Sequence, residues 1–418
     1  MKNMNMKRSS FRTVLIRGIG CMVLLLVLIA AAKTVTVSKE TPGRKGPGSY
    51  YELKVLIPAG TKFEVIETKK SWLKVKYNEQ EVWISENSLS EATNKAEDPF
   101  ATMALGGARA EASPAALAAA IKGFWTRYSR TNRADLAELP LNGYDISPAS
   151  YDAFERERAR AVSRDELLKK YKLSKQYRTP EIPYVKEQQS GYSVASSVAE
   201  GRLFEDEKVL AYVHSVGWYI AEGTERPDIR YNYYILDTDH INAISCPGGY
   251  VILTRGLLEL LDNEAELAAL LAHEMAHVIA GHGMKEVYED KVRIVADDAF
   301  SALDKATDGS SKMEEELIAI TNRATSIAKS PKLDKYEFEA DEMALRYMAR
   351  SGYDLNGLAG LLTKLKSQHD REVDMFDLNY RNHPDFNKRM ELSAKELKEY
   401  SKYTGLKFAE DFNENMVF

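Results

Sequence analysis

The chain has 418 residues, which is too long for one ordinary hydrophobic core and indicates two or three domains. The formal net charge is −5, both signs are mixed along the chain, and no basic block occurs beyond the N-terminus. This pattern argues against a nucleic-acid-binding protein. The only cysteines are Cys21 and Cys246, so cysteine usage does not report the redox compartment, and a thiolate-rich metal site is excluded.

The N-terminus has the features of an export segment. Several Lys and Arg residues precede an apolar run at residues 18–32, and this run ends in three alanines before Lys33. This pattern predicts an export signal at residues 1–32, with an uncleaved membrane anchor as the alternative. In both cases the rest of the chain is exported, to the periplasm or the extracytoplasmic face of the inner membrane, and this segment is the only expected membrane contact.

Residues 33–92 are expected to form a small β-domain. Residues 33 to about 50 contain several Pro and Gly residues and predict a linker or a first loop. Alternating apolar residues then predict short strands around residues 63–65, 73–77 and 82–84. The stretches 59–65, 72–75 and 82–84 resemble bacterial SH3-like β-barrels. That resemblance implies a cell-wall or protein ligand, and a folded spacer without a ligand is the alternative.

The following region, residues 93–189, is expected to be a linker and helical region, and no function is assigned to it. Its first part, up to about residue 113, is rich in Ala, Gly, Ser and Thr, and a charged helix is expected over about 151–171. A compact domain is expected at residues 190–400. A C-terminal tail is expected at residues 401–418.

Two β-rich runs on either side of a tight turn lie in the expected compact domain. A strand is expected at residues 229–236, and further β-rich sequence surrounds a Pro-Gly-Gly turn. A strand in this place could offer its edge to an extended peptide. The residues expected to bind substrate in this way are Asn242, Ala243, Pro247, Gly248 and Gly249.

The strongest functional signal is an H-E-x-x-H pattern on an expected helix. Apolar residues recur there at helical spacing, Asn263 marks a capped start, and Gly281 marks a stop. His273 and His277 lie one turn apart on the same face, where two imidazoles can bind one zinc ion. Glu274 lies beside them as a candidate general base. The alternative, two ordinary histidines on an apolar face, is costly because unpaired imidazoles would be buried.

A second expected helix, over residues 335–350, carries a candidate third ligand. Glu337 and Asp341 are four residues apart and share an otherwise apolar face, so they need a cationic partner. We expect Glu337 to bind the metal and Asp341 to accept the free N–H of a zinc-bound histidine. Glu339 is expected to be solvated. The alternative is the surface face of an ordinary acidic helix.

Residues 190–395 resemble the M48 family of zinc metallopeptidases. The resemblance rests on residues 242–243, 247–250, 256–258 and 263–268, on HEMAH followed by His282, and on EFEAD at 337–341. It implies an α+β fold: a mostly helical, gluzincin-like zincin domain with a small β-sheet, preceded here by the SH3-like β-barrel. It also implies one Zn²⁺ per chain, bound by His273, His277 and Glu337, with Glu274 as the general base.

The same resemblance extends to a histidine-proline loop, residues 382–384, and to Arg389. In some members a loop of this kind lies near the zinc and can occupy its open position. His383 is therefore expected to bind zinc, to stabilise the oxyanion or only to cap a helix, and these alternatives stay open. Arg389 is the second candidate for stabilising the oxyanion.

These features together predict an exported zinc endopeptidase that acts on proteins or peptides. By the resemblance, its substrates are misfolded or unassembled envelope proteins. Two alternatives remain: a latent-site, chaperone-like or binding protein, and a cell-wall-targeted peptide hydrolase anchored by the SH3-like domain.

Overall fold

This computed structural model describes residues 34–89, 146–172, 184–199, 201–283, 321–326, 334–370 and 385–418, with the single positions 115, 118, 119, 121, 122, 139, 144 and 318. The expected export segment, residues 1–32, and the Ala/Gly-rich linker lie outside these residues. Residues 34–418 form one compact unit. Within the described ranges, no helix has both the length and the apolar character that crossing a membrane requires.

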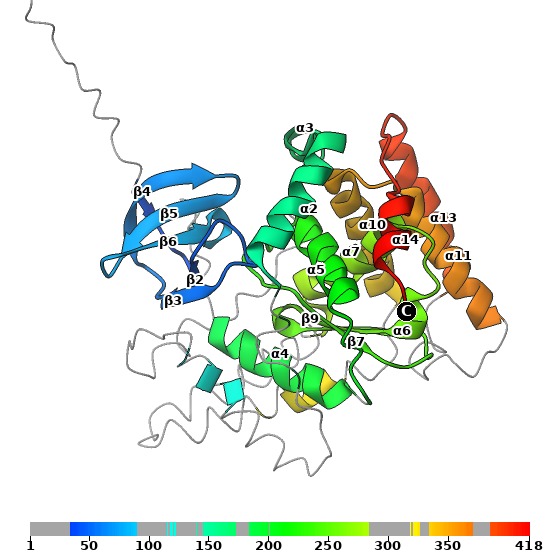
Figure 1. The fold of residues 1–418 in the computed structure, drawn as a ribbon, viewed down its shortest axis with the longest axis horizontal. Coiled ribbons are helices and arrows are strands. Elements are labelled where there is room, and N and C mark those ends of the chain that lie inside the picture. The colour runs from blue at the N-terminus through cyan, green and yellow to red at the C-terminus, as the bar shows by residue number, and fades with distance from the viewer. Residues whose placement is uncertain are drawn as a thin grey trace, which may run out of the picture. The chain divides into compact units, whose positions relative to one another are not determined.

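Residues 34–89, here called the N-terminal β-domain, form a six-stranded antiparallel sheet in the order β1-β4-β5-β6-β2-β3 (Figure 1). Its strands are β1 (Thr34–Thr36), β2 (Thr41–Arg44), β3 (Leu53–Ile57), β4 (Lys62–Lys69), β5 (Trp72–Tyr77) and β6 (Gln80–Ser85), followed by the 3₁₀ turn η1 (Glu86–Ser88). The alternating residues that predicted strands, such as Phe63, Leu73 and Val75, line its core. The SH3-like identity of this sheet stays a prediction.

The structure corrects the expectation of a linker or loop at residues 33–50, because β1 and β2 lie there. β2 contains Pro42 and Gly43, which predicted irregular backbone, yet it pairs with β3. A Cβ on Gly43 would lie 2.9 Å from a methyl group of Val55 and 3.1 Å from one of Val82. Gly43 therefore allows a close packing approach, and tertiary pairing overrides the local turn preference.

The rest of the described chain is helical, apart from a second sheet of three strands, β7 (Asn232–Leu236), β8 (Ala243–Cys246) and β9 (Tyr250–Thr254). The 3₁₀ turn η3 (Pro247–Gly249) joins β8 to β9. The helical elements are α2 (Pro148–Ala161), α3 (Arg164–Lys170), α4 (Tyr184–Val198), α5 (Glu207–Ala221), α6 (Arg255–Leu258), α7 (Glu264–Ala280), α10 (Asp334–Ser351), α11 (Asn356–Asp370), α13 (Phe386–Glu396), η4 (Leu397–Tyr400) and α14 (Ala409–Asn415). The α+β fold class is confirmed.

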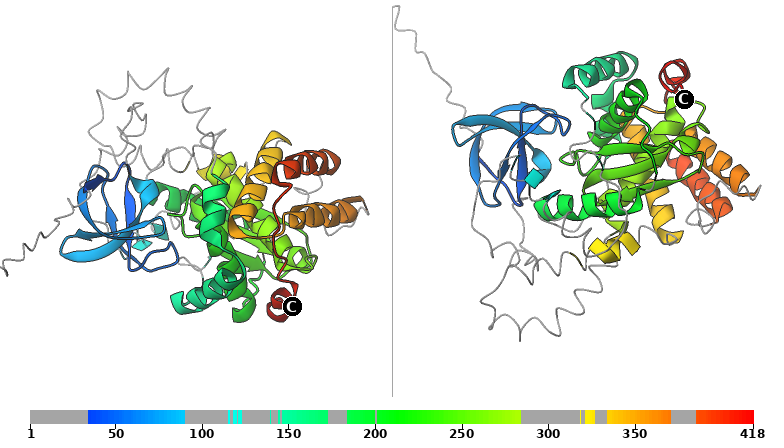
Figure 2. Two further views of the ribbon diagram at one scale, coloured as in Figure 1. Left: turned by 90° about the horizontal axis from the view of Figure 1, so that it is seen from above. Right: turned by 60° about the horizontal axis from the view of Figure 1, so that its bottom comes forward.

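The second sheet lies between α4 on one face and the helices α5 and α7 on the other (Figures 1 and 2), and a hydrophobic core lies on each face. Tyr233 and Ile235 of β7 pack with α5, α7 and α10, whereas Tyr234 and Leu236 pack with α4 on the opposite face. Successive strand side chains point to opposite faces, so both faces of β7 are buried. The order is β7-β9-β8, with β9 parallel to β7 and antiparallel to β8. β8 therefore lies at one end of the sheet, beside α7.

The residues expected as a free C-terminal tail belong to the main core. Phe412 and Met416, in and after α14, are buried together with residues of α5 and α7. A buried acidic residue also ties distant segments together: Glu264, the first residue of α7, accepts hydrogen bonds from Arg158, Tyr212 and Tyr353. The start of α7 is thus fixed by α2, α5 and the chain after α10.

His214 of α5 is a buried histidine with both ring nitrogens engaged. Its Nδ1–H donates to the carbonyl of Leu210 at 2.8 Å, and its Nε2 accepts the backbone N–H of Tyr233 at 3.1 Å. Protonation of Nε2 would break the second contact, which ties α5 to β7. Burial lowers the pKa of His214 to about 3.

We predict a pH-dependent loss of stability from His214. An unfolded histidine binds a proton near pH 6.5, whereas folded His214 stays neutral until about pH 3, so its stabilisation is present above pH 6.5 and is lost as the pH falls. Between pH 6.5 and 5.0 this group should lower the free energy of unfolding by about 1.5 kcal/mol. Urea unfolding of His214→Gln should lack this part of the pH slope. His240→Gln, at an exposed site, is the matched control, and an unchanged slope in His214→Gln would contradict the assignment.

Candidate metal centre

Helix α7 forms where the sequence predicted it, between a polar cap and a glycine. The Asn263 side chain accepts the backbone N–H of Glu266 at 3.1 Å, which satisfies one donor of the first turn. Gly281 ends the helix in the left-handed region at φ 68°. Every residue of α7 is buried, and its most extensive helix contact is with α10. The two expected motifs therefore meet in the interior.

Three buried side chains converge between α7 and α10. The Nε2 atoms of His273 and His277 are 3.1 Å apart. Glu337 places Oε2 at 3.3 Å from His273 Nε2 and Oε1 at 3.2 Å from His277 Nε2. The glutamate side chain is fully buried and the histidines are nearly so. These are the three residues that the sequence analysis assigned as metal ligands.

The separations and charges of these groups fit a zinc ion. Tetrahedral ligands about 2.0–2.1 Å from zinc lie about 3.3 Å from one another, close to the three distances observed here. The buried carboxylates of Glu337 and Asp341 face one buried guanidinium, that of Arg389. Glu274, next to His273 on α7, is a third buried acidic residue. A dication would balance the difference, and three protein ligands leave a position for a reacting molecule.

Asp341 and Arg389 contact two of the candidate ligands, His273 and Glu337. Asp341 Oδ1 lies 2.9 Å from Nδ1 of His273, the nitrogen that faces away from Glu337. Arg389 donates to both oxygens of Asp341 at 2.8 and 2.7 Å, and its third nitrogen lies 2.9 Å from Glu337 Oε2. Burial alone lowers the pKa of His273, but the contacts with Asp341 and Glu337 raise it to about 9. The local field therefore strongly favours a positive charge at this place.

The structure gives Arg389 different contacts from the expected one with an oxyanion. The side chain of Arg389 is 4% exposed, and its nitrogen atoms face Asp341 and Glu337. It lies on α13, whose start is capped by Asp385, so the position of α13 is coupled to the ligand set. His383, the other expected catalytic residue, lies outside the described residues, as does the rest of the histidine-proline loop.

The residues expected to bind substrate fall into two groups. Ala243 begins the end strand β8, and the backbone of Asn242 just before it is hydrogen bonded to Thr254 Oγ1. Pro247, Gly248 and Gly249 form the turn η3, which packs against α4. The two glycines are buried, with φ of 72° and 85°. The positive φ angles of the turn therefore explain why glycine occupies both positions.

The sequence analysis gave His282 no role at the metal centre and did not foresee the contact between His282 and Glu339. His282 Nδ1 lies 2.9 Å from His277 Nδ1. If Nε2 of His277 binds a metal ion, its Nδ1 carries the proton and can donate it to His282. His282 stacks on Tyr336 at 4.4 Å between ring centroids, and its Nε2 lies 3.4 Å from Glu339 Oε2. Glu339, which was expected to be solvated, is partly exposed: its side chain is 26% exposed, and it also contacts the histidine that lies beside His277.

We predict that Glu339→Gln weakens zinc binding without unfolding the protein. Loss of the carboxylate removes the contact that orients His282, and through it His277, so zinc affinity should fall about 10-fold or more in a chelator competition assay. Glu342→Gln, on the same helix and facing Arg346, is the matched control and should bind zinc as the wild type does. Equal affinity in both variants would remove Glu339 from the metal centre.

Comparison with known proteins identifies metalloprotease relatives. The model of peptidase family M48 matches residues 207–396. The beta-barrel assembly-enhancing protease of Escherichia coli (strain K12) is 26% identical over 183 residues, which cover 43% of this chain and 37% of the relative. Metalloprotease YcaL of the same strain is 31% identical over 147 residues, 35% of this chain and 56% of the relative. The mitochondrial metalloendopeptidase OMA1 of Schizosaccharomyces pombe is 28% identical over 88 residues, which cover 19% of this chain and 26% of the relative.

Each of these three matches covers less than two thirds of the relative's own length. The region that matches the family model contains the H-E-x-x-H helix. The expected resemblance to M48 metallopeptidases is therefore confirmed for residues 207–396, which form a peptidase M48 domain.

Proposed function

We propose that this chain is a zinc-dependent endopeptidase that binds one Zn²⁺ through His273, His277 and Glu337. The observation that carries the proposal is the convergence of these ligand atoms, all within 4.8 Å of one another, in a buried site on two helices. The bound zinc would lower the pKa of a water molecule and polarise a substrate carbonyl. The chain supplies ligand orientation, proton transfer and substrate alignment.

Glu274 is the proposed general base. It directly follows His273 on α7, and its residue is 2% exposed. Its carboxylate would take the proton of the attacking water and pass it to the leaving amine. Asp341 would fix the ring of His273, and Arg389 would hold Asp341 and Glu337 during this transfer. Arg389 is thus proposed as a positioning residue, and His383 remains the candidate for a direct contact with the oxyanion.

We propose that the substrate is a protein segment in extended conformation. Among the described strands, β8 pairs only with β9, and it lies next to α7. The substrate would add as a strand along the other edge of β8. Ala243 would begin the pairing segment. An extended peptide presents its backbone carbonyls at regular intervals, so pairing along β8 would set which carbonyl lies near Glu274.

The proposed setting is the cell envelope, with misfolded or unassembled envelope proteins as substrates. Support comes from the N-terminal basic and apolar segment and from the relative whose name is beta-barrel assembly-enhancing protease. The N-terminal segment would export or anchor the chain on the extracytoplasmic side.

The test combines zinc content with casein cleavage for residues 33–418 and for Glu274→Gln. We expect one zinc per chain in both proteins and cleavage only in the wild type, with a loss of at least about 100-fold in the variant. Removal of the metal with a chelator should abolish wild-type cleavage, and added zinc should restore it. Absence of zinc from both proteins would refute the metal centre, whereas equal cleavage by both would refute the role of Glu274.

A further inference from the structure

The N-terminal β-domain is docked on the helical part of the chain through buried polar groups. Arg44 of β2, 2% exposed, donates to the carbonyl of Tyr51 within its own domain, to Tyr184 Oη and to the carbonyl of Asp228, at 3.1, 3.4 and 3.4 Å. Asn87 donates to the carbonyl of Glu225. A buried guanidinium is costly unless its donors are paired, so these contacts define one docked position.

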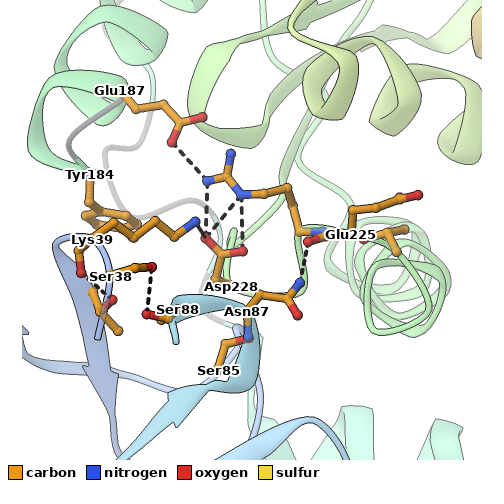
Figure 3. Close-up of polar contacts among 12 residues, drawn as sticks. Ser38, Lys39, Ser85, Asn87, Ser88, Tyr184, Glu187, Glu225 and Asp228 are labelled. Atoms are coloured by element: carbon orange, nitrogen blue, oxygen red, sulfur yellow. Dashed lines mark hydrogen bonds and ion pairs between the residues drawn. The ribbon is translucent and has the colours of Figure 1, made fainter. Parts of the chain in front are cut away.

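The docking contacts continue into an ion network shown in Figure 3. Lys39 Nζ lies 3.5 Å from Asp228, which also accepts two-pronged hydrogen bonds from Arg226. Arg226 donates in turn to Glu187 of α4 at 3.1 Å. Burial raises the pKa of Asp228, but Arg226 and Lys39 outweigh burial and hold that pKa well below its usual range. The four groups alternate in charge and join the β-domain to α4.

The first turn of α4 is held directly by the β-domain. Glu40 accepts the backbone N–H of Val185 at 3.1 Å, which places a carboxylate at the N-terminus of α4. Tyr184, the first residue of the helix, accepts from Arg44. Two adjacent residues of the β-domain, Lys39 and Glu40, therefore act on α4, one through the ion network and one through the helix terminus.

The same helix holds the turn that ends β8. Gln188 donates to the carbonyl of Gly248 at 3.1 Å and accepts from Tyr250 Oη at 3.0 Å. A Cβ on Gly191 would lie 1.9 Å from the carbonyl oxygen of Pro247, so the helix backbone rests on the turn. Positions 184, 187, 188 and 191 share one face of α4. Because of these contacts, we expect a displacement of α4 to displace η3 and the end of β8 as well.

We propose that the N-terminal β-domain is a fixed positioning element for the substrate strand, with Lys39 and Glu40 acting on β8 through α4. This inference rests on the proposed role of β8 in peptide binding. The β-domain is in this view an integral part of the peptidase, and its removal or release impairs binding of extended substrates while the metal centre stays intact.

The test compares two paired variants of the β-domain in the chain from residue 33 onward. Lys39→Met/Glu40→Ala removes the contact of Lys39 with Asp228 and the contact of Glu40 with the backbone of Val185 in α4. Lys45→Met/Glu52→Ala removes an exposed ion pair of the same residue types, with side chains 67% and 59% exposed, and is the matched control. Amide hydrogen exchange and casein kinetics are measured on both proteins, together with zinc content.

In the Lys39/Glu40 variant we expect faster exchange at residues 185–191 and at 243–250, with unchanged exchange in α7 and one zinc per chain. The KM for casein should rise about 10-fold with little change in kcat, because substrate binding is weakened without loss of the reacting groups. The control should match the wild type. Faster exchange in α4 that does not reach 243–250, or an unchanged KM, would overturn the proposal.

Failure of the proposed function has a different signature, since it would show as absent cleavage in the wild type itself. The exchange result at 243–250 does not depend on catalysis. It therefore decides the positioning role in that case as well.

Discussion

Glu337 and Asp341 place two carboxylates in the contact between α7 and α10, where a buried charge without a partner costs several kcal/mol. The surrounding groups offset this free-energy cost. Arg389 supplies one positive charge and three donors, and His273 is driven toward its protonated form. A site built in this way strongly favours a cation, and its two imidazoles select a metal that accepts nitrogen ligands. The position of α13 follows from the same constraint.

The opposite end of α7 shows the same principle with a different outcome. Glu264 is as deeply buried as Glu337, but Arg158 and two tyrosine hydroxyls satisfy its oxygens. That carboxylate therefore fixes the start of the helix, and its oxygens are already paired without a metal ion. Burial of an acidic residue alone does not distinguish a structural site from a functional one. The two sites differ in their neighbours: Arg158 and two tyrosine hydroxyls donate to Glu264, whereas Glu337 lies beside Arg389 and two imidazoles that could share a metal ion with it.

Local sequence was sufficient for the elements and motifs that have their own periodicity or caps. Asn263, Gly281 and the spacing of His273 and His277 located α7 and its metal face, and the pair Glu337 and Asp341 located α10. What could not be read depends on tertiary contacts between distant segments. β2 forms at a Pro-Gly pair because β3 pairs with it, and the partly exposed Glu339 contacts His282. Neither partner is adjacent in sequence, so no local pattern reports the contact.

The docking of the β-domain is the most distant of these contacts and changes how the chain is divided. Its sequence pattern indicates an independent module, since periodicity reports only a domain's own core. Yet Tyr50 packs against Tyr151 and Trp218 at centroid distances of 4.2 and 5.6 Å, and it belongs to the core that contains α7. Together with the buried Arg44, this contact would expose both an aromatic cluster and an unpaired charge if the domain detached. Detachment is therefore costly for both reasons, and the β-domain belongs to the same compact unit as α7.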